Sequence, residues 1–460
     1  MRPELDDTHD PSLRSWVEAA NDDANNFPIQ NLPFGVFSVD GEDEDDARVG
    51  VAIGDHIVDL AELVDARMFP GLDSADEPLI DDVAVPMLNL LMMSDATRVR
   101  GIRQRLSELL SEGNDELRKK KKLVERALVP MEACELHMPV DVGDFTDFYA
   151  SKHHATNVGS MFRPDNPLLP NYVHIPVGYH GRSSSVIVSG EAVTRPNGQT
   201  KADDADRPSF GPCKLLDYEM EVGLFIGGED NELGEPVPLR DAWERLWGVV
   251  LLNDWSARDM QKWEYQPLGP FLAKSFASTI SPWVVTRDAL APFRCAVTSR
   301  TDADPDPLEH LYHDDDQSAG MIDMTVEVYL LTEQMRKKKV DAVRLSSGSY
   351  RDMFWTPGQM IAHHASNGCN LEAGDLLGSG TISGPERESR GCLLELTWNG
   401  SATDPKPGSD RSPIVLPTGE ERVFLQDGDE VIMRGYCERE GARRIGFGEC
   451  RAVVEPAPKA

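Results

Sequence analysis

The chain has 460 residues, 40% of them hydrophobic, with 37 glycines and 32 prolines; this predicts roughly two to four turn-rich domains built mainly from strands. Its 79 acidic and 46 basic residues give a formal net charge of −33. That charge excludes nucleic acid and anionic membrane surfaces as general partners, because like charges repel. There is no apolar signal core, no membrane-length apolar run and no C-x-x-C pair among the seven cysteines, so we expect a cytoplasmic protein.

The N-terminal part of the sequence divides into a polar stretch and a strand-rich stretch. Residues 1–26 are rich in Asp and Asn and predict a loosely held arm. Between residues 27 and 63, GVFSVD, RVGVAIGD and HIVDLAEL are separated by acidic and glycine turns. These short strands indicate a small β-barrel.

A helix and a basic run follow. Val99, Ile102 and Leu106 recur at helical spacing and predict a helix with one apolar face. The run RKKKK at 118–122 is interpreted as a solvated helical linker, not as a binding patch. We therefore expect an N-terminal domain over residues 27–137, with this helical linker at its end.

Residues 138–460 are expected to form the second domain. HIPVGYHGR, SSSVIVSG, MTVEVYLL, GCLLELTW and EVIMRGYC all have the composition of strands bounded by turns. The segment 301–318 contains DADPDP and HDDD and is interpreted as an exposed acidic loop.

Acidic and apolar residues alternate between Leu215 and Phe225. Because successive side chains of a strand point to opposite faces, Asp217, Glu219 and Glu221 are expected on one side. A half-exposed strand explains this pattern equally simply. Carboxylates two residues apart repel, however, unless a cation lies between them. Asp254, directly after an apolar strand, is a plausible further ligand.

The next segment carries cations and an amide. Arg258, Gln261 and Tyr265 would share one face of a helix, which fits either a surface pair with an incidental Gln or a face lining a pocket. Lys274 lies in a mostly apolar segment, where an unpaired ammonium is costly. It therefore needs a carboxylate partner or an anionic substrate.

The stretch DFTDFYASKHHATNVGSMFR gathers Asp147, Tyr149, His154 and Arg163. In an extended segment the neighbours His153 and His154 would point to opposite faces, so one histidine of the pair is expected to face a site. The pair 363–364 is interpreted in the same way, without a metal role. A histidine base needs an orienting acceptor. Glu395, in the apolar strand pattern CLLELTW, is the candidate.

Seven motifs spread over most of the chain occur together in one known family. They are DFTDFYASKHHATNVG (144–159), LLPNYVHIPVGYHGR (168–182), LLDYEMEVGLFIG (215–227), LLNDWSARDMQKWEYQPLGPFLAKSF (251–276), TISPW (279–283), GSGTISG (378–384) and GFGEC (446–450). In this order, and with the barrel-like N-terminal part, they resemble the fumarylacetoacetase family.

The resemblance implies a mainly β (α+β) protein with a small N-terminal SH3-like β-barrel domain and a large C-terminal mixed β-sandwich roll of the fumarylacetoacetase type. It also implies a homodimer that hydrolyses the C–C bond of 4-fumarylacetoacetate to fumarate and acetoacetate, in the catabolism of tyrosine and phenylalanine. A Ca²⁺ or Mg²⁺ ion would stabilise the enolate leaving group.

The resemblance also assigns roles to residues by position. The metal ligands would be Asp147, Glu219, Glu221 and Asp254, and a second magnesium would lie at Asp254, Lys274 and Ser278. His154 would be the general base, oriented by Glu395. Arg258, Gln261 and Lys274 would stabilise developing negative charge. Substrate contacts would be Tyr149, Arg163, Tyr179, Gln261, Tyr265 and Thr381.

Two alternatives and one departure accompany these expectations. Another superfamily enzyme, an acylpyruvate hydrolase or an oxaloacetate-type decarboxylase, shares the carboxylates. A non-catalytic protein with a structural calcium site is the alternative of a different class. Ala277-Ser278 replaces the family's Gly-Thr, so the loop would be strained if Ala277 needed a positive φ.

Overall fold

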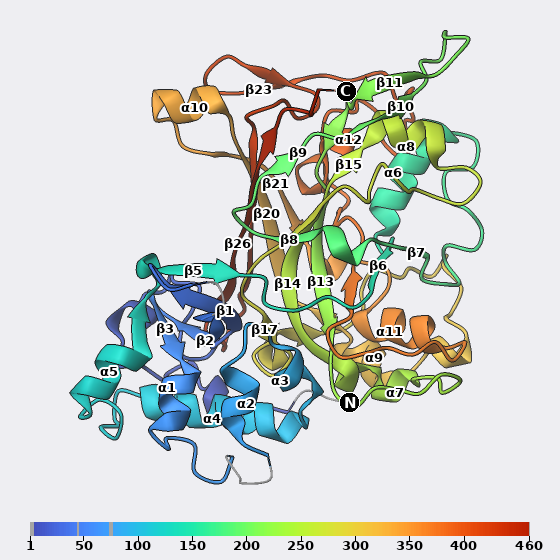
Figure 1. Ribbon diagram of the computed structural model, residues 1–460. Helices are drawn as coiled ribbons and strands as arrows, with labels where there is room; N and C mark the ends of the chain where they lie inside the picture. The colour runs from blue at the N-terminus through green and yellow to red at the C-terminus, as the bar shows by residue number, and fades with distance from the viewer. Residues whose placement is uncertain (1–3, 44–45, 73–76, 460) are drawn as a thin grey trace.

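The computed structural model describes residues 4–43, 46–72 and 77–459. An eight-stranded and a five-stranded sheet form the large C-terminal body, and another five-stranded sheet lies in the N-terminal part (Figure 1). Helices flank these sheets. The mainly β character predicted from composition and turn patterns is confirmed.

The N-terminal sheet is antiparallel with the order β4-β3-β2-β1-β5. Its strands are β1 (Phe34–Val39), β2 (Arg48–Ile53), β3 (His56–Asp59), β4 (Leu128–Pro130) and β5 (Cys134–His137). The pattern HIVDLAEL is only partly a strand. The Asp59 carboxylate accepts a hydrogen bond from the Glu62 amide and caps α1 (Leu60–Asp65), so the strand ends there.

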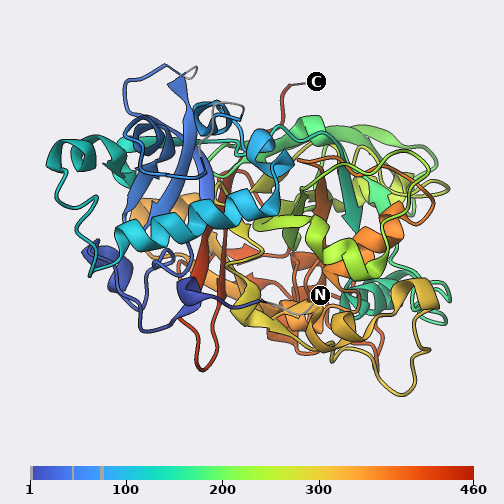
Figure 2. The same ribbon diagram turned by 90° about the horizontal axis from the view of Figure 1, so that it is seen from below.

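The predicted amphipathic helix is present as α4 (Ala96–Leu110), and Figure 2 shows it as the long helix of the N-terminal part. Val99, Ile102 and Leu106 are buried in the same core as the N-terminal strands. The shorter helices of this part are α2 (Leu79–Val83), α3 (Asn89–Met93) and α5 (Lys121–Ala127). Residues 118–122 are exposed, which confirms that the basic run is solvated.

The described part of the polar N-terminal stretch is not a loosely held arm. Ser15 Oγ donates to the Leu110 carbonyl at 2.8 Å, and Trp16 Nε1 donates to the Leu109 carbonyl at 2.9 Å. Val17 and Ala20 are buried. Composition alone predicted freedom here, whereas the unpaired carbonyls at the end of α4 supply acceptors that hold this stretch in place.

The eight-stranded sheet positions most of the candidate site. The order β7-β6-β22-β13-β14-β16-β8 forms its main path, and β17 pairs with β14 off that path. Its strands are β6 (Phe145–Phe148), β7 (Gly178–His180), β8 (Val186–Val188), β13 (Met220–Ile226), β14 (Leu246–Asp254), β16 (Ser278–Ile280), β17 (Val285–Thr286) and β22 (Leu376–Gly378). β13 and β14 are buried along their whole length, as central strands covered on both faces must be.

The second sheet of the body has the order β21-β20-β25-β26-β9. Its strands are β9 (Val193–Thr194), β20 (Met324–Leu331), β21 (Val343–Ser349), β25 (Glu430–Cys437) and β26 (Ile445–Glu455). In β20 buried and half-buried residues alternate, which matches its sequence pattern. Leu251 of the first sheet and Met433 of the second belong to one hydrophobic core.

Short elements complete the body. The strand pairs are β10 (Asn197–Thr200) with β11 (Ser209–Pro212), β12 (Leu216–Asp217) with β15 (Ser256–Ala257), β18 (Arg294–Cys295) with β19 (Met321–Ile322), and β23 (Ile414–Val415) with β24 (Glu421–Arg422). The helices are α6 (Lys152–Phe162), α7 (Leu239–Ala242), α8 (Arg258–Glu264), α9 (Asp314–Ala319), α10 (Glu333–Lys338), α11 (Pro357–Ala365) and α12 (Leu393–Leu396).

The end of the segment 301–318 differs from the exposed acidic loop that we predicted. The sequence HDDD begins α9, and Asp316 is buried and accepts a hydrogen bond from Thr356 Oγ1 at 2.9 Å. A partner distant in the sequence therefore orders what composition indicated was a flexible tip.

The N-terminal part and the body share a core. The backbones of Phe34 and Val284 exchange two hydrogen bonds, and the Phe34 ring meets Trp247 edge-on at 5.6 Å between centroids. The domain boundary at residue 137 falls at the end of β5 and stays a prediction. Among the described residues, no helix combines the length and apolarity needed to cross a bilayer.

Candidate active site

Four buried carboxylates meet beside the central strands of the eight-stranded sheet. Asp147 lies on β6, Glu221 on β13 and Asp254 at the end of β14, whereas Glu219 lies between β12 and β13. One oxygen atom from each lies within 4.8 Å of the others. The predicted strand 215–225 is therefore interrupted at Tyr218-Glu219, and its acidic residues face the protein interior.

Gly378 leaves room for this cluster. It pairs with Asp147 across β6 and β22, and a Cβ at this position would lie 2.4 Å from Asp147 Oδ1. Any other residue would therefore push into the carboxylates. The first glycine of GSGTISG, Gly378, is thus explained by its close approach to Asp147 and not by a turn.

The charge of the cluster is only partly balanced by protein cations. Lys274 Nζ lies 2.7 Å from Glu219 Oε2 and 2.5 Å from Asp254 Oδ2, and Arg258 Nη1 lies 2.6 Å from Glu219 Oε1. Burial alone would raise the pKa of Glu219, but Lys274 and Arg258 hold it well below its usual value. Four carboxylates with two cations leave a formal charge of −2.

The remaining carboxylate oxygens fit a divalent cation. Asp147 Oδ1 and Glu221 Oε1 are buried and have no hydrogen-bond partner within the described part of the chain. Burial and neighbouring carboxylates raise the pKa of Asp147 and of Glu221 well above their usual values. Unpaired buried oxygens of this kind are costly unless a cation binds them, and an all-carboxylate set suits Ca²⁺ or Mg²⁺. The set therefore forms a candidate metal centre.

The predicted second magnesium position has different geometry. The Lys274 ammonium has no lone pair and already binds Asp254 and Glu219, so in this arrangement it replaces a metal ion and does not ligate one. Ser278 donates its side-chain hydroxyl to Asp254 Oδ1 at 3.0 Å. A second ion at Ser278 stays a prediction. Ala277 is not among the described residues with positive φ, so the condition under which this loop would be strained is not met.

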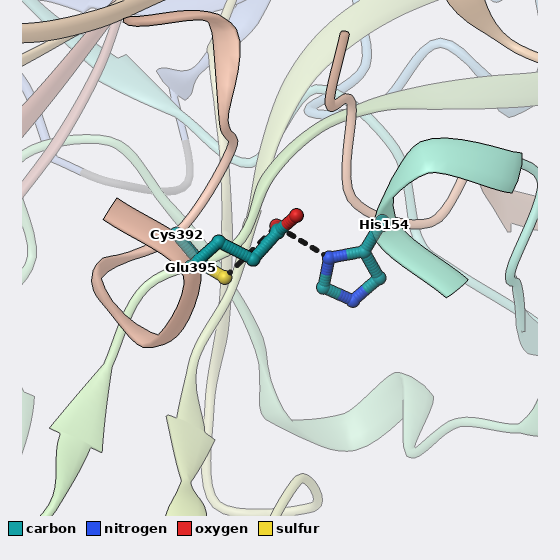
Figure 3. A group of neighbouring side chains, drawn as sticks. All are labelled: His154, Cys392 and Glu395. Carbon is teal, nitrogen blue, oxygen red and sulfur yellow. Dashed lines mark hydrogen bonds and ion pairs between the residues drawn. The ribbon is translucent and has the colours of Figure 1, made fainter. Parts of the chain in front are cut away.

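A histidine–glutamate pair lies at the other half of the site, shown in Figure 3. His154 Nδ1 lies 2.6 Å from Glu395 Oε2, and both side chains are buried. His154 is on α6, not in an extended segment, so His153 and His154 diverge by helical rotation. Glu395 is on α12, not on a strand, because the Asp217 carboxylate accepts hydrogen bonds from the Leu393 and Leu394 amides and starts a helical turn.

The Glu395 carboxylate is ionised. Burial would raise its pKa, but His154 and the hydrogen bonds to its oxygens lower it to about 2. An ionised carboxylate only accepts hydrogen bonds, so Nδ1 of His154 donates to it and Nε2 carries the free lone pair. The pair thus presents a proton acceptor whose tautomer is fixed by Glu395.

Other predicted site residues gather here to different degrees. Tyr149 meets the His154 ring edge-on at 5.1 Å between centroids, and Tyr179 OH donates to Asp254 Oδ2 at 2.8 Å. Gln261 Oε1 accepts from Arg258 Nη1 at 3.2 Å on α8. The buried Thr381 Oγ1 has no hydrogen-bond partner in residues 4–43, 46–72 and 77–459, so it could receive a substrate group.

Two predicted substrate residues and one histidine pair are less closely tied to this cluster. Tyr265 is the C-cap of α8 and Arg163 is that of α6. Arg163 Nη2 donates a long hydrogen bond of 3.4 Å to the Pro167 carbonyl. His363 and His364 lie on α11, outside the cluster of four carboxylates. The substrate roles of Tyr265 and Arg163 stay predictions.

Two polar residues of the site carried no sequence signal, and a third has other partners than its strand pattern suggests. Asp217, expected on the same strand face as Glu219 and Glu221, joins Arg258 to α12 instead. Asn157 Nδ2 and Ser383 Oγ each donate to Glu395 at 2.8 Å. Asn157 lies 238 positions before Glu395 and Ser383 lies 12 positions before it. Both belong to family motifs, but no helical or strand periodicity relates either residue to Glu395.

The fold and this site define a hydrolase-type α+β protein with a candidate carboxylate metal centre beside a histidine–glutamate pair. Residues 144–455 match the family described as Fumarylacetoacetate (FAA) hydrolase C-terminal, and residues 30–139 match Fumarylacetoacetase N-terminal. The chain belongs to the fumarylacetoacetase family.

Curated relatives extend over nearly the full chain. The chain is 48% identical to the fumarylacetoacetase of Caenorhabditis elegans over 447 residues, covering 97% of this chain and 100% of that protein. It is 46% identical to that of Dictyostelium discoideum over 452 residues (97% and 99%) and 46% identical to that of Homo sapiens over 444 residues (96% and 99%). The family predicted from the motifs is confirmed.

Proposed function

We propose that this chain hydrolyses 4-fumarylacetoacetate to fumarate and acetoacetate, the last step of tyrosine and phenylalanine breakdown. The observation that carries the proposal is the hydrogen bond of 2.6 Å between His154 Nδ1 and Glu395, whose helix is linked through Asp217 and Arg258 to Glu219 of the four buried carboxylates. Full-length similarity to curated fumarylacetoacetases supports the choice of substrate.

The proton transfers follow from the tautomer of His154. Nε2 takes a proton from water while Nδ1 stays bonded to Glu395, which stabilises the imidazolium that forms. The hydroxide adds to the ketone carbon next to the fumaroyl group. General-base help of this kind contributes roughly two to four powers of ten in rate.

The charge that develops on the substrate is met by protein cations. Lys274, Arg258 and the Gln261 amide would receive the alkoxide; Arg258 Nη2, a buried donor with no hydrogen-bond partner among the described residues, supports this role. The bond between the carbonyl carbon and the adjacent methylene then breaks, leaving fumarate and the acetoacetate enolate. The imidazolium proton of His154 returns to the methylene carbon, so the proton taken from water ends on acetoacetate.

Asp147, Glu219, Glu221 and Asp254 would hold the divalent cation. When bound, it supplies Lewis-acid stabilisation of the diketone oxygens and of the enolate. We propose Ca²⁺ or Mg²⁺, because zinc favours nitrogen and sulfur ligands.

We also propose a cytoplasmic homodimer, by analogy with the family. The strand number of the N-terminal sheet supports an SH3-like barrel, although no pairing between its edge strands β4 and β5 is present among the described residues. We propose that residues 27–137 and residues 138–460 form the two domains of the chain.

The test follows loss of the diketone absorbance in the presence of fumarylacetoacetate. We expect turnover that His154→Gln and Glu395→Gln reduce by about two to four powers of ten without loss of bound metal. His153→Gln is the matched control, because His153 neighbours the base on α6 and has no contact with Glu395 among the described hydrogen bonds. Turnover of acylpyruvates but not of fumarylacetoacetate would refute the substrate, and retained turnover in His154→Gln would refute the base.

A further inference from the structure

The Glu395 carboxylate is surrounded by hydrogen-bond donors. Oε2 receives His154 Nδ1, Ser383 Oγ at 2.8 Å and Cys392 Sγ at 3.3 Å, and Oε1 receives Asn157 Nδ2 at 2.8 Å. All of these side chains are buried, so water cannot replace a missing donor. The position and charge of this carboxylate therefore depend on its protein partners.

Among these donors, Ser383 has a particular place. Its hydroxyl oxygen accepts the Gly391 amide hydrogen at 2.9 Å, so its own hydrogen is left for Glu395 Oε2. This is the same oxygen that binds His154. The Gly391 amide and the Glu395 carboxylate thus fix the orientation of the Ser383 hydroxyl. Both Ser383 Oγ and His154 Nδ1 bind Glu395 Oε2, so each bond reduces the negative charge available to the other.

The backbone of Ser383 reaches the other end of the same pair. Its carbonyl accepts a hydrogen bond from Ser151 Oγ at 2.9 Å, and Ser151 Oγ caps α6 by accepting the His154 amide at 3.2 Å. One residue therefore contacts Glu395 through its side chain and the start of the His154 helix through its main chain. Ser383 also follows Thr381, a predicted substrate contact, by two residues.

We propose that Ser383 is a positioning residue of the proton-transfer pair, which fixes the Glu395 carboxylate and the first turn of α6 relative to each other and withdraws charge from Oε2. The expected change in kcat rests on the proposed function, whereas the positioning of Glu395 and α6 does not. Ser383 touches neither reacting atom and acts through Glu395.

The test compares Ser383→Ala and Ser383→Thr with the wild-type enzyme saturated with Ca²⁺ or Mg²⁺. Ser383→Ala keeps the carbonyl contact with Ser151 but removes the donor to Glu395, so we expect kcat to fall about tenfold or more while KM changes less than about twofold. With one donor fewer, Glu395 holds the protonated imidazole more strongly. The low-pH limb of the kcat profile therefore moves to higher pH, and Ser383→Thr restores both properties.

A second readout does not depend on turnover. NMR titration of the His154 imidazole should show the same movement to higher pH in Ser383→Ala. The other titratable groups near the ring, Tyr149, Cys392 and Glu219, are unchanged by this substitution. If the wild-type protein fails to cleave fumarylacetoacetate but the NMR shift is present, the proposed function is refuted and the positioning role stands.

Ser15→Ala is the matched control, because Ser15 is also buried, donates to a carbonyl and accepts a backbone amide. It should lower the melting temperature without changing kcat or the titration of His154. A purely structural serine would behave in the same way at position 383. An unmoved titration of His154 in Ser383→Ala would overturn the proposal.

Discussion

Nε of Arg258 donates a hydrogen bond to Oδ2 of Asp217 at 3.0 Å, and the same carboxylate starts the helix that carries Glu395. Asp217 is fully buried and is not one of the four clustered carboxylates. It therefore links the charge-stabilising half of the site to the proton-transfer half. A buried carboxylate in this place has a mechanical task as well as an electrostatic one.

Asp217→Asn should impair both halves at once. The amide nitrogen must face a donor, either Arg258 or an amide of α12, so we expect kcat to fall about a hundredfold and the free energy of unfolding to fall by about 2–4 kcal/mol. Kinetics and denaturant unfolding measure the two effects. Asp429→Asn is the control, because Asp429 forms a buried pair with Arg422 and belongs to neither cluster. Equal losses of kcat in both variants would contradict the linking role.

Lys274→Met should separate metal binding from catalysis. The substitution removes a cation bonded to Glu219 and Asp254, so the carboxylates become more negative and should bind Ca²⁺ at least as tightly. Without the ammonium, kcat should fall by about two to three powers of ten. Calorimetric titration with Ca²⁺ alongside kinetics checks this, and weaker Ca²⁺ binding in Lys274→Met would mean that Lys274 supports the metal centre.

Removal of the metal should destabilise the protein as well as inactivate it. A cation at one hundred times its Kd stabilises the folded state by about 2.7 kcal/mol, so chelator should lower the melting temperature and added Ca²⁺ or Mg²⁺ should restore it. Because burial and neighbouring carboxylates raise the pKa of Asp147 and Glu221, protons compete with the cation and its affinity should fall as pH is lowered. In Glu221→Gln the response of the melting temperature to Ca²⁺ should be lost; a normal response would place the ion elsewhere.

Asp316 predicts a pH dependence of stability that is independent of the site. Burial raises the pKa of Asp316 from 3.8 to about 6, so folding favours its protonated form. Its stabilising contribution to the free energy of unfolding is therefore fully present below pH 3.8 and is lost as the pH rises through 6. Asp316→Asn keeps an acceptor for Thr356 and should gain stability over the wild type, by about 1–3 kcal/mol at pH 8 and almost nothing at pH 4. Thermal unfolding at the two pH values measures it. The exposed Asp65→Asn should show no such difference.

Much of the candidate metal centre was predictable from local sequence. Glu219 and Glu221 lie two residues apart in an otherwise apolar stretch, and Asp254 follows an apolar strand. Such spacing indicates a shared face whatever the rest of the chain does. The helix α4 was predictable for the same reason, because its apolar period is local.

The helical position of Glu395 was not predictable from its neighbours. CLLELTW has the composition of a buried strand, but the Asp217 carboxylate, 176 residues before Leu393, accepts the Leu393 amide and starts α12. The N-terminal stretch is similar: its polarity predicts freedom, but carbonyls at the end of α4 hold it. In both places a distant partner outweighs local preference.

The motifs alone were sufficient to identify the family, the alternating carboxylates and a histidine with a carboxylate to orient it. Other features depend on the assembled fold: Asp217 stays outside the carboxylate cluster, Lys274 compensates that cluster as an ammonium, and Ser383 joins Glu395 to α6. These features rest on contacts between residues that lie far apart in the chain. Periodicity and motifs report contacts within a few residues, whereas His154 and Glu395 are 241 residues apart and meet only when the sheets and helices are assembled.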